Sequence, residues 1–183
     1  MLVVRRVQRP PGLRFLMIGD RIPELTLPLV SPHPAVSSQN HSLRSLFTGR
    51  KSLVLTHPGA FTFLSSSRML PEYMAALSAL QTAGIQQVLA LSVNDKFVQT
   101  AFAQRCALSI GQISDWRGEL THTLELGLPA DLYFAYVARR AIFLVDESAT
   151  VLGLRCEESV LYTRQTAPSS ALAMVKACFG SPS

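Results

Sequence analysis

The chain has 183 residues, of which 48% are hydrophobic and 16% charged, and it carries a formal net charge of +5. A chain of this length buries roughly 70% of the surface that its unfolded form exposes, so the composition favours one globular domain over a repeat array or a disordered tail. Its apolar runs fall short of the ~18 residues that a membrane-spanning helix needs, so we expect no membrane insertion.

The positive charge is concentrated at the N-terminus. Four arginines (Arg5, Arg6, Arg9 and Arg14) precede the first acidic residue, Asp20, which leaves 13 basic against 12 acidic residues in the remainder. An arginine-rich stretch without acidic residues is typical of a mitochondrial presequence. We therefore predict a basic leader over residues 1–17 that directs the chain to the mitochondrion, with a cytoplasmic location as the alternative, and one folded domain over 18–183.

Strand and helix patterns alternate along the rest of the chain. Short β-rich runs predict strands over residues 52–57, 86–93, 110–114, 133–138, 141–145 and 150–156. Helical spacing and end signals predict helices over 68–83, from Asn94 or Asp95 through Phe102, over 118–126 and from Pro168 to Cys178. This alternation predicts an α/β sandwich with a mixed central sheet flanked by helices.

The cysteine pattern argues against a disulfide framework and against a metal site. Cys106, Cys156 and Cys178 are far apart in sequence, their number is odd, and no C-x-x-C motif occurs. We expect reduced thiols, no metal and no cofactor. Redox chemistry through these three cysteines is the weakest of the functional hypotheses, because no two of them have a motif spacing.

The segment His57–Tyr73, HPGAFTFLSSSRMLPEY, resembles the active-site segment of the peroxiredoxins, in particular the atypical two-cysteine branch known as the peroxiredoxin-five-like or redoxin group. Pro58 and Thr62 match the family motif Pro-x-x-x-Thr-x-x-Cys. Ser92-Val93-Asn94-Asp95 is similar to the stretch after the family's third strand, and Arg140 falls at its second active-site arginine.

The resemblance covers about residues 18–179. Ile18-Gly19-Asp20 with Ile22-Pro23 looks like the opening strand of the family, and Ala167-Pro168 like the start of its C-terminal helix. The resemblance implies a thioredoxin-like fold, the reduction of hydrogen peroxide and organic hydroperoxides by a thiol, and a homodimer.

Four positions depart from the family pattern. Ser65 stands at the position of the peroxidatic cysteine and Arg164 at that of the resolving cysteine, while Phe63 replaces a proline and Met69 a histidine. Peroxide reduction needs a thiolate, and a serine hydroxyl has no comparable anionic population at neutral pH. We therefore interpret Pro58, Thr62, Ser65 and Arg140 as vestigial catalytic residues. An engineered Cys-to-Ser change at Ser65 would leave the other three departures unexplained.

Other readings of these residues are open at the level of sequence. A hydrolase pair of Ser65 and His57 lacks the G-x-S-x-G elbow, and the run Ser65-Ser66-Ser67 is better explained as helix N-cap chemistry. Arg140 offers a guanidinium to a small anion at that helix N-terminus. Alternatively, Arg139-Arg140 forms a solvated hairpin turn.

The loss of both redox cysteines predicts a non-catalytic protein. We expect it to be a structural or assembly subunit of a larger mitochondrial complex, with protein partners and, in the case of the mitochondrial ribosome, rRNA. The alternative is an active thiol peroxidase in which Ser65 replaces the native cysteine. The apolar residues around the site, Phe61, Phe63, Leu64 and Met69, provide a partner surface in one reading. In the reading that we favour, Phe63 and Met69 instead fill the former peroxide pocket.

Overall fold

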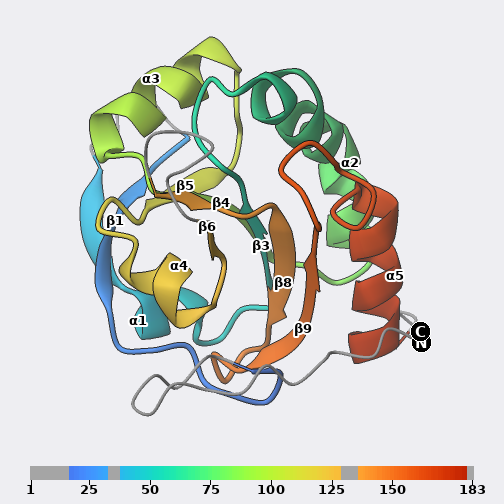
Figure 1. Cartoon of the computed structure of the whole chain (residues 1–183). Helices are drawn as coiled ribbons and strands as arrows, with labels where there is room; N and C mark the ends of the chain where they lie inside the picture. The colour runs from blue at the N-terminus through green and yellow to red at the C-terminus, as the bar shows by residue number, and fades with distance from the viewer. Residues whose placement is uncertain (1–16, 33–37, 129–135, 181–183) are drawn as a thin grey trace.

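The fold is a central β-sheet with helices on both faces (Figure 1). The computed structural model describes residues 17–32, 38–128 and 136–180. Seven strands form one sheet in the order β2-β1-β5-β4-β3-β8-β9. They are β1 (Thr26–Val30), β2 (Gln39–Ser42), β3 (Ser52–Thr56), β4 (Gln87–Ser92), β5 (Gly111–Ser114), β8 (Ala141–Val145) and β9 (Val151–Cys156), and β6 (Gly127–Leu128) pairs separately with β7 (Val137–Ala138).

The sheet is mixed, as predicted. Strands β3, β4 and β5 are parallel, whereas β1 runs antiparallel to β5, and β8 runs antiparallel to both β3 and β9. The parallel strands occupy the centre, where both faces of the sheet are covered, as parallel strands require. The predicted α/β sandwich with a mixed central sheet is confirmed.

The helices divide between the two faces. They are α1 (Leu43–Phe47), the π-helical turn η1 (Ser65–Met69), α2 (Leu70–Thr82), α3 (Lys96–Arg105), α4 (Glu119–Thr123) and α5 (Pro168–Phe179). Residues of α2, α3 and α5 pack with Leu53 and Leu55 of β3, while residues of α1 and α4 pack with Val54 on the other face. This alternation along β3 places one hydrophobic core on each side of the sheet.

The predicted helix ends are confirmed where the sequence has a specific cap. The Asp95 carboxylate accepts hydrogen bonds from the backbone N–H groups of Phe97 (2.8 Å) and Val98 (3.0 Å) and so begins α3. Pro168 occupies the first turn of α5. Gly84, with a φ of +97°, follows α2 in a backbone conformation that favours glycine.

The N-terminal part of the sheet differs from the prediction. The segment 18–23 contributes one isolated bridge, between Arg21 and Thr150, and the sheet's N-terminal elements are β1, β2 and α1, which the sequence patterns did not predict. Pro28 lies within β1, and β2 reads Gln-Asn-His-Ser. A proline and an all-polar sequence are both tolerated in or beside an edge strand but give no strand signal.

Three further predictions differ in extent. The helix predicted over 118–126 is shortened to α4, because Leu124 ends it and Glu125 has a φ of +54°. Of the predicted strand 133–138, residues 133–135 lie outside the described residues and Val137–Ala138 forms β7. Most of the predicted leader, residues 1–16, also lies outside them. Among the helices that the structure does describe, none combines the length and apolarity needed to cross a bilayer.

Candidate functional site

The candidate site lies at the edge of the sheet where the parallel strands β3, β4 and β5 end. The loop 57–64 leaves β3 at this edge and leads directly into η1 and α2. The backbone N–H of His57 donates to the Leu91 carbonyl (3.0 Å), which holds the start of the loop against β4. Pro58 and Gly59 are buried. Carboxyl ends of parallel strands are the usual place for functional loops in such sheets.

Asn94, in the loop after β4, is joined to the loop after β3 and to the last residue of β5. Its Oδ1 accepts hydrogen bonds from the Ala60 backbone N–H (2.7 Å) and the Ser92 hydroxyl (3.1 Å), and its carbonyl accepts one from the Ser114 hydroxyl (2.9 Å). A side chain at Gly59 would bring a Cβ within 3.3 Å of the same Oδ1. The Ser-Val-Asn-Asp block therefore positions the loop 57–64, a role that its polar composition after a buried strand could have indicated.

Thr62, Ser65 and Arg140 form one hydrogen-bonded group, in which Ser65 and Arg140 are buried and Thr62 is half-buried. The Thr62 hydroxyl donates toward Ser65 Oγ (2.7 Å) and the Gly59 carbonyl (2.9 Å). Arg140 Nη1 donates to Ser65 Oγ (3.1 Å), and Arg140 Nε donates to the Val160 carbonyl (2.7 Å). Ser65 is fully buried and Arg140 is 2% exposed. The structure thus brings together three of the predicted site residues, with Pro58 buried in the same loop.

His57 follows β3 in the core, as its place at the end of the predicted strand 52–57 indicated, but the sequence analysis missed its position beside the site. The register that pairs Thr56 with Ala141 places the next residues, His57 and Arg140, opposite each other on the face that also carries Leu53 and Leu55. His57 is fully buried, and its ring centroid lies 5.9 Å from that of Phe102. Alternation from Leu53 through Leu55 would have predicted which face it occupies.

Burial dominates the protonation of His57. Neither ring nitrogen reaches hydrogen-bond geometry with a partner among the described residues. Burial lowers the pKa of His57 from 6.5 to about 4. The Gly59 backbone raises this pKa by less than burial lowers it, and the charge of Arg140 lowers it further. The imidazole is therefore neutral at pH 7. No hydrogen bond joins it to Ser65 in the described structure, so the residues do not form a hydrolase pair.

Two interpretations of the polar residues are wrong. Ser66 and Ser67 do not cap the helix through their hydroxyls: each hydroxyl donates to the carbonyl four residues earlier, that of Thr62 (3.0 Å) or Phe63 (2.7 Å). This back-bonding is common where serine lies inside a helix rather than at its start. Arg140 does not lie in a solvated turn, because its side chain is buried against η1 and the loop that follows β9.

The filled-pocket prediction holds for one of its two residues. Met69 is 1% exposed, and its sulfur lies 3.5 Å from Arg140 Nη1, so it occupies space beside Ser65. Phe63 is 80% exposed and fills nothing. Phe61 is half-exposed, has a φ of +61° and packs edge-on against Phe102 with a centroid separation of 5.2 Å.

The remaining predicted residues lie apart from this group. Arg164 is exposed in the loop between β9 and α5, with its guanidinium 5.4 Å from the ring centre of Tyr162. The three cysteines are free, and burial raises the pKa of each thiol, that of Cys156 to about 11. Cys156 packs against the core on the opposite face of the sheet from Ser65. Among the described residues, no three His, Cys, Asp or Glu side chains gather closely enough to hold a metal ion.

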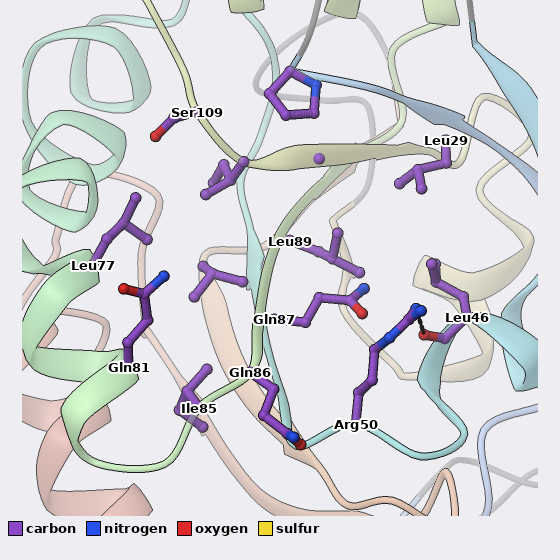
Figure 2. A pocket seen from close by; sticks show the side chains of 14 residues that line it. Leu29, Leu46, Arg50, Leu77, Gln81, Ile85, Gln86, Gln87, Leu89 and Ser109 are labelled. Atoms are coloured by element: carbon purple, nitrogen blue, oxygen red, sulfur yellow. Dashed lines mark hydrogen bonds between the residues drawn. The ribbon is translucent and has the colours of Figure 1, made fainter. Parts of the chain in front are cut away.

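A separate groove of about 350 Å³ lies at the opposite edge of the sheet, where β4 and β5 begin. Figure 2 shows Arg50 and Leu46 on one side of it and Leu77 and Gln81 on the other. The Arg50 guanidinium donates to the Leu46 carbonyl (3.4 Å). The groove shares no residue with the group around Ser65.

Comparisons with known proteins identify the family and the fold. The sequence profile of the family described as Redoxin matches residues 17–167. The chain is 30% identical over 164 residues to peroxiredoxin-2E, chloroplastic, of Arabidopsis thaliana, covering 86% of this chain and 68% of the relative. It is 30% identical over 167 residues to peroxiredoxin-2E-2, chloroplastic, of Oryza sativa subsp. japonica, covering 88% and 72%.

A solved structure shares the fold. It is the reduced Prx3 of Vibrio vulnificus in complex with H2O2, which superposes with a TM-score of 0.79 at 24% identity over 88% of this chain and 97% of that one. Peroxiredoxin 5 of Alvinella pompejana superposes with a TM-score of 0.73 at 22% identity, covering 88% of this chain and 99% of that one.

Proposed function

Because this chain belongs to the redoxin family and is a peroxiredoxin by its relatives and its fold, we propose that it is a catalytically degenerate peroxiredoxin. In this proposal it has lost thiol peroxidase activity and serves as a structural or assembly subunit of a larger complex. Its vestigial catalytic residues are Pro58, Thr62, Ser65 and Arg140, with Arg164 at the resolving position.

One observation carries the proposal: a serine hydroxyl receives the hydrogen bonds of Thr62 and Arg140 at the start of η1. A peroxidase needs a thiolate there to attack the O–O bond and become a sulfenic acid. The chain's three thiols offer no substitute, because burial raises the pKa of each and none is among the residues that contact Ser65. In this chain, Thr62 and Arg140 donate to the neutral hydroxyl of Ser65 instead of to a thiolate.

The second candidate function is an active thiol peroxidase with a cysteine at position 65. The arrangement of Thr62 and Arg140 favours it, since a donated hydrogen bond and a guanidinium are the groups that lower a thiol pKa. Met69 weighs against it, because its sulfur also contacts the Arg140 guanidinium.

Restoring the thiol separates the two candidates. We expect no peroxide reduction by the wild-type chain, and for Ser65→Cys a rate less than about tenfold above the Ser65→Ala control, equivalent to ~1.4 kcal/mol of barrier. The reason is the Met69 side chain, which lies beside the site and contacts the Arg140 guanidinium. Hydrogen peroxide consumption with dithiothreitol as reductant measures the rate. Rapid turnover by Ser65→Cys would contradict degeneration and support the second candidate.

Location and assembly follow from the same proposal. Two similar relatives are named as chloroplastic, and the basic leader 1–17 supports delivery to an organelle. We infer that this organelle is the mitochondrion; a cytoplasmic location is the alternative. The proposed partners are protein subunits, with the mitochondrial ribosome and its rRNA as one candidate assembly. Relatives in this family commonly form homodimers, and a homodimer is the competing assembly.

Sedimentation tests the subunit role. We expect the tagged chain, in an extract of cells that express it, to sediment with a particle many times its own 20.0 kDa mass. A matched gradient with ribonuclease distinguishes a ribosomal particle from a protein complex. Sedimentation only as a free monomer or dimer would contradict the subunit role.

A further inference from the structure

The groove of about 350 Å³ where β4 and β5 begin has the volume of a binding site for a compact organic molecule. Leu46 of α1 and Arg50, in the turn that follows α1, form one side of it. Leu77 and Gln81 of α2 form the other side, and Leu89 of β4 lies between the two (Figure 2). Pockets that hold small molecules have volumes of roughly 300–1,000 Å³, so this groove suits a ligand at the small end of that range.

Much of the groove lining is apolar. Ile85, Leu89 and Ile110, which line it, are buried, whereas Leu29 and Leu77 are only half-buried. A ligand that covers half-exposed leucines removes apolar surface from water, which favours its binding. Ligand sites typically combine such a lining with a few polar groups that fix the orientation of the ligand.

Arg50 supplies a positive charge at one side of the groove. Its Nη1 donates to the Leu46 carbonyl (3.4 Å), which holds the guanidinium beside the groove, as the dashed line in Figure 2 marks. The ion pairs of the described residues do not include Arg50. Glu147, whose carbonyl accepts a hydrogen bond from the Gly49 backbone N–H, directs its carboxylate to Lys51 (3.7 Å) instead. The charge of Arg50 is therefore available to an anion.

Two neutral amides face the same groove. Gln87, which is half-buried, extends from β4 toward the side that carries Arg50, and Gln81 lies on the facing side (Figure 2). Neither amide has a hydrogen-bond partner among the described residues, whereas the Gln86 Oε1 accepts from the Lys51 backbone N–H (2.9 Å). A side-chain amide has two N–H donors, so Gln87 can donate to an anion that Arg50 attracts.

We propose that this groove binds a small organic monocarboxylate. Its carboxylate accepts hydrogen bonds from the Arg50 guanidinium and the Gln87 amide, and its apolar body lies over Leu89 toward Leu77. The inference goes beyond the proposed function and does not depend on it, because the groove lies at the opposite edge of the sheet from Ser65 and shares no residue with the group around it.

The charges favour a carboxylate over a phosphate or a neutral ligand. The planar guanidinium matches the two oxygens of a carboxylate. A phosphate monoester carries a charge of about −1.5 to −2 at pH 7, which one cation does not balance. Lys51 is already engaged, because it pairs with Glu147 and lies 4.8 Å from the ring centre of Phe179. A wholly apolar ligand would cover Arg50 and Gln87 without giving them a partner, which costs free energy.

Isothermal titration calorimetry of the purified full chain tests the inference with three probes. Octanoate carries both the carboxylate and an apolar body, octanamide has the same length without the charge, and inorganic phosphate is an anion without an apolar body. We expect octanoate to bind with a Kd of ~0.1–1 mM, as suits a ligand of about ten non-hydrogen atoms. We expect octanamide to bind about fivefold more weakly and phosphate to give no detectable binding.

Two variants and two matched controls locate the site. Arg50→Gln removes the cation, and Gln87→Glu places a negative charge beside the carboxylate. We expect each to weaken octanoate binding about fivefold, the upper range for an ion pair that water can reach. Arg155→Gln on β9 and Gln104→Glu on α3 repeat these charge changes at exposed positions outside the groove, and we expect neither to alter the Kd. Circular dichroism verifies that each variant is folded.

Four results would overturn the inference. Equal affinities for octanoate and octanamide would show that the groove does not select a carboxylate. A folded Arg50→Gln variant that binds octanoate as tightly as wild type would place the ligand elsewhere. Phosphate that binds more tightly than octanoate would identify a phosphate site, and no heat at octanoate concentrations tenfold above the expected Kd would show that no such site exists. None of these results bears on peroxidase activity, which Ser65→Cys tests separately.

Discussion

Acidification from pH 7 to pH 4 is expected to destabilise the folded chain by about 3 kcal/mol through His57 alone. The pKa of His57 is about 4 in the folded chain, against 6.5 for an ordinary histidine. Each unit of difference between the folded and unfolded pKa is worth about 1.4 kcal/mol once the pH lies below both values. At pH 4, close to the folded pKa, most of that difference has been lost.

The sign follows from which state binds the proton. Above pH 6.5 the imidazole is neutral in both states, so His57 adds no pH dependence. Between pH 6.5 and 4 the unfolded chain takes up a proton that the folded chain does not, because protonation would place a charge on a fully buried ring opposite Arg140. Stability therefore falls as the pH falls, and the loss levels off below pH 4.

Urea unfolding of wild type and His57→Leu at pH 7, 6, 5 and 4 measures this contribution. Carboxylates titrate in the same window in both proteins, so the difference between the two curves isolates His57. We expect His57→Leu to lose about 3 kcal/mol less than wild type between pH 7 and 4. The exposed His122→Leu is the matched control and is expected to follow wild type. Parallel curves for wild type and His57→Leu would contradict the assignment.

The elements that could be predicted from sequence are those with local signals. Buried strands β3 and β4 read as apolar runs, Asp95 caps α3 through its own side chain, and Pro168 begins α5. Each signal depends on a few neighbouring residues, and each was confirmed. Alternation of these elements was enough to predict the α/β sandwich.

The contents of the site depend on contacts between distant residues and were only partly predictable. The resemblance to the family identified Thr62, Ser65 and Arg140, but whether Arg140 is buried depends on the loop after β9, which supplies the Val160 carbonyl. Phe63 and Met69 are both apolar residues of one segment, yet η1 turns one inward and leaves the other in solvent. Their shared apolar character did not distinguish them, because Phe63 lies before η1 and Met69 lies within it.

Phe102→Ala is expected to destabilise the folded chain by about 3–5 kcal/mol, a typical cost for removing a buried ring. Phe102 is fully buried in the core formed with α2 and α5, and it contacts both His57 and Phe61. The conservative Phe102→Leu fills most of the space and is expected to lose no more than about 1.5 kcal/mol. Urea unfolding at pH 7 measures both values, and a loss below 1 kcal/mol for Phe102→Ala would show that the ring does not support the loop.

The same variant is expected to weaken the acid sensitivity described above, because the two residues are in contact. The cavity left by Phe102→Ala lies beside the His57 ring, whose nitrogens have no hydrogen-bond partner among the described residues, and a polar group at a cavity allows water to enter. Hydration favours the imidazolium, so the pKa of His57 rises toward its ordinary value and the decline between pH 7 and 4 becomes shallower. A double-mutant cycle of unfolding free energies compares wild type, His57→Leu, Phe102→Ala and the double variant. We expect its interaction energy to grow as the pH falls, within the 0.5–3 kcal/mol usual for contacting residues. Additivity at every pH would mean that burial of His57 does not depend on Phe102.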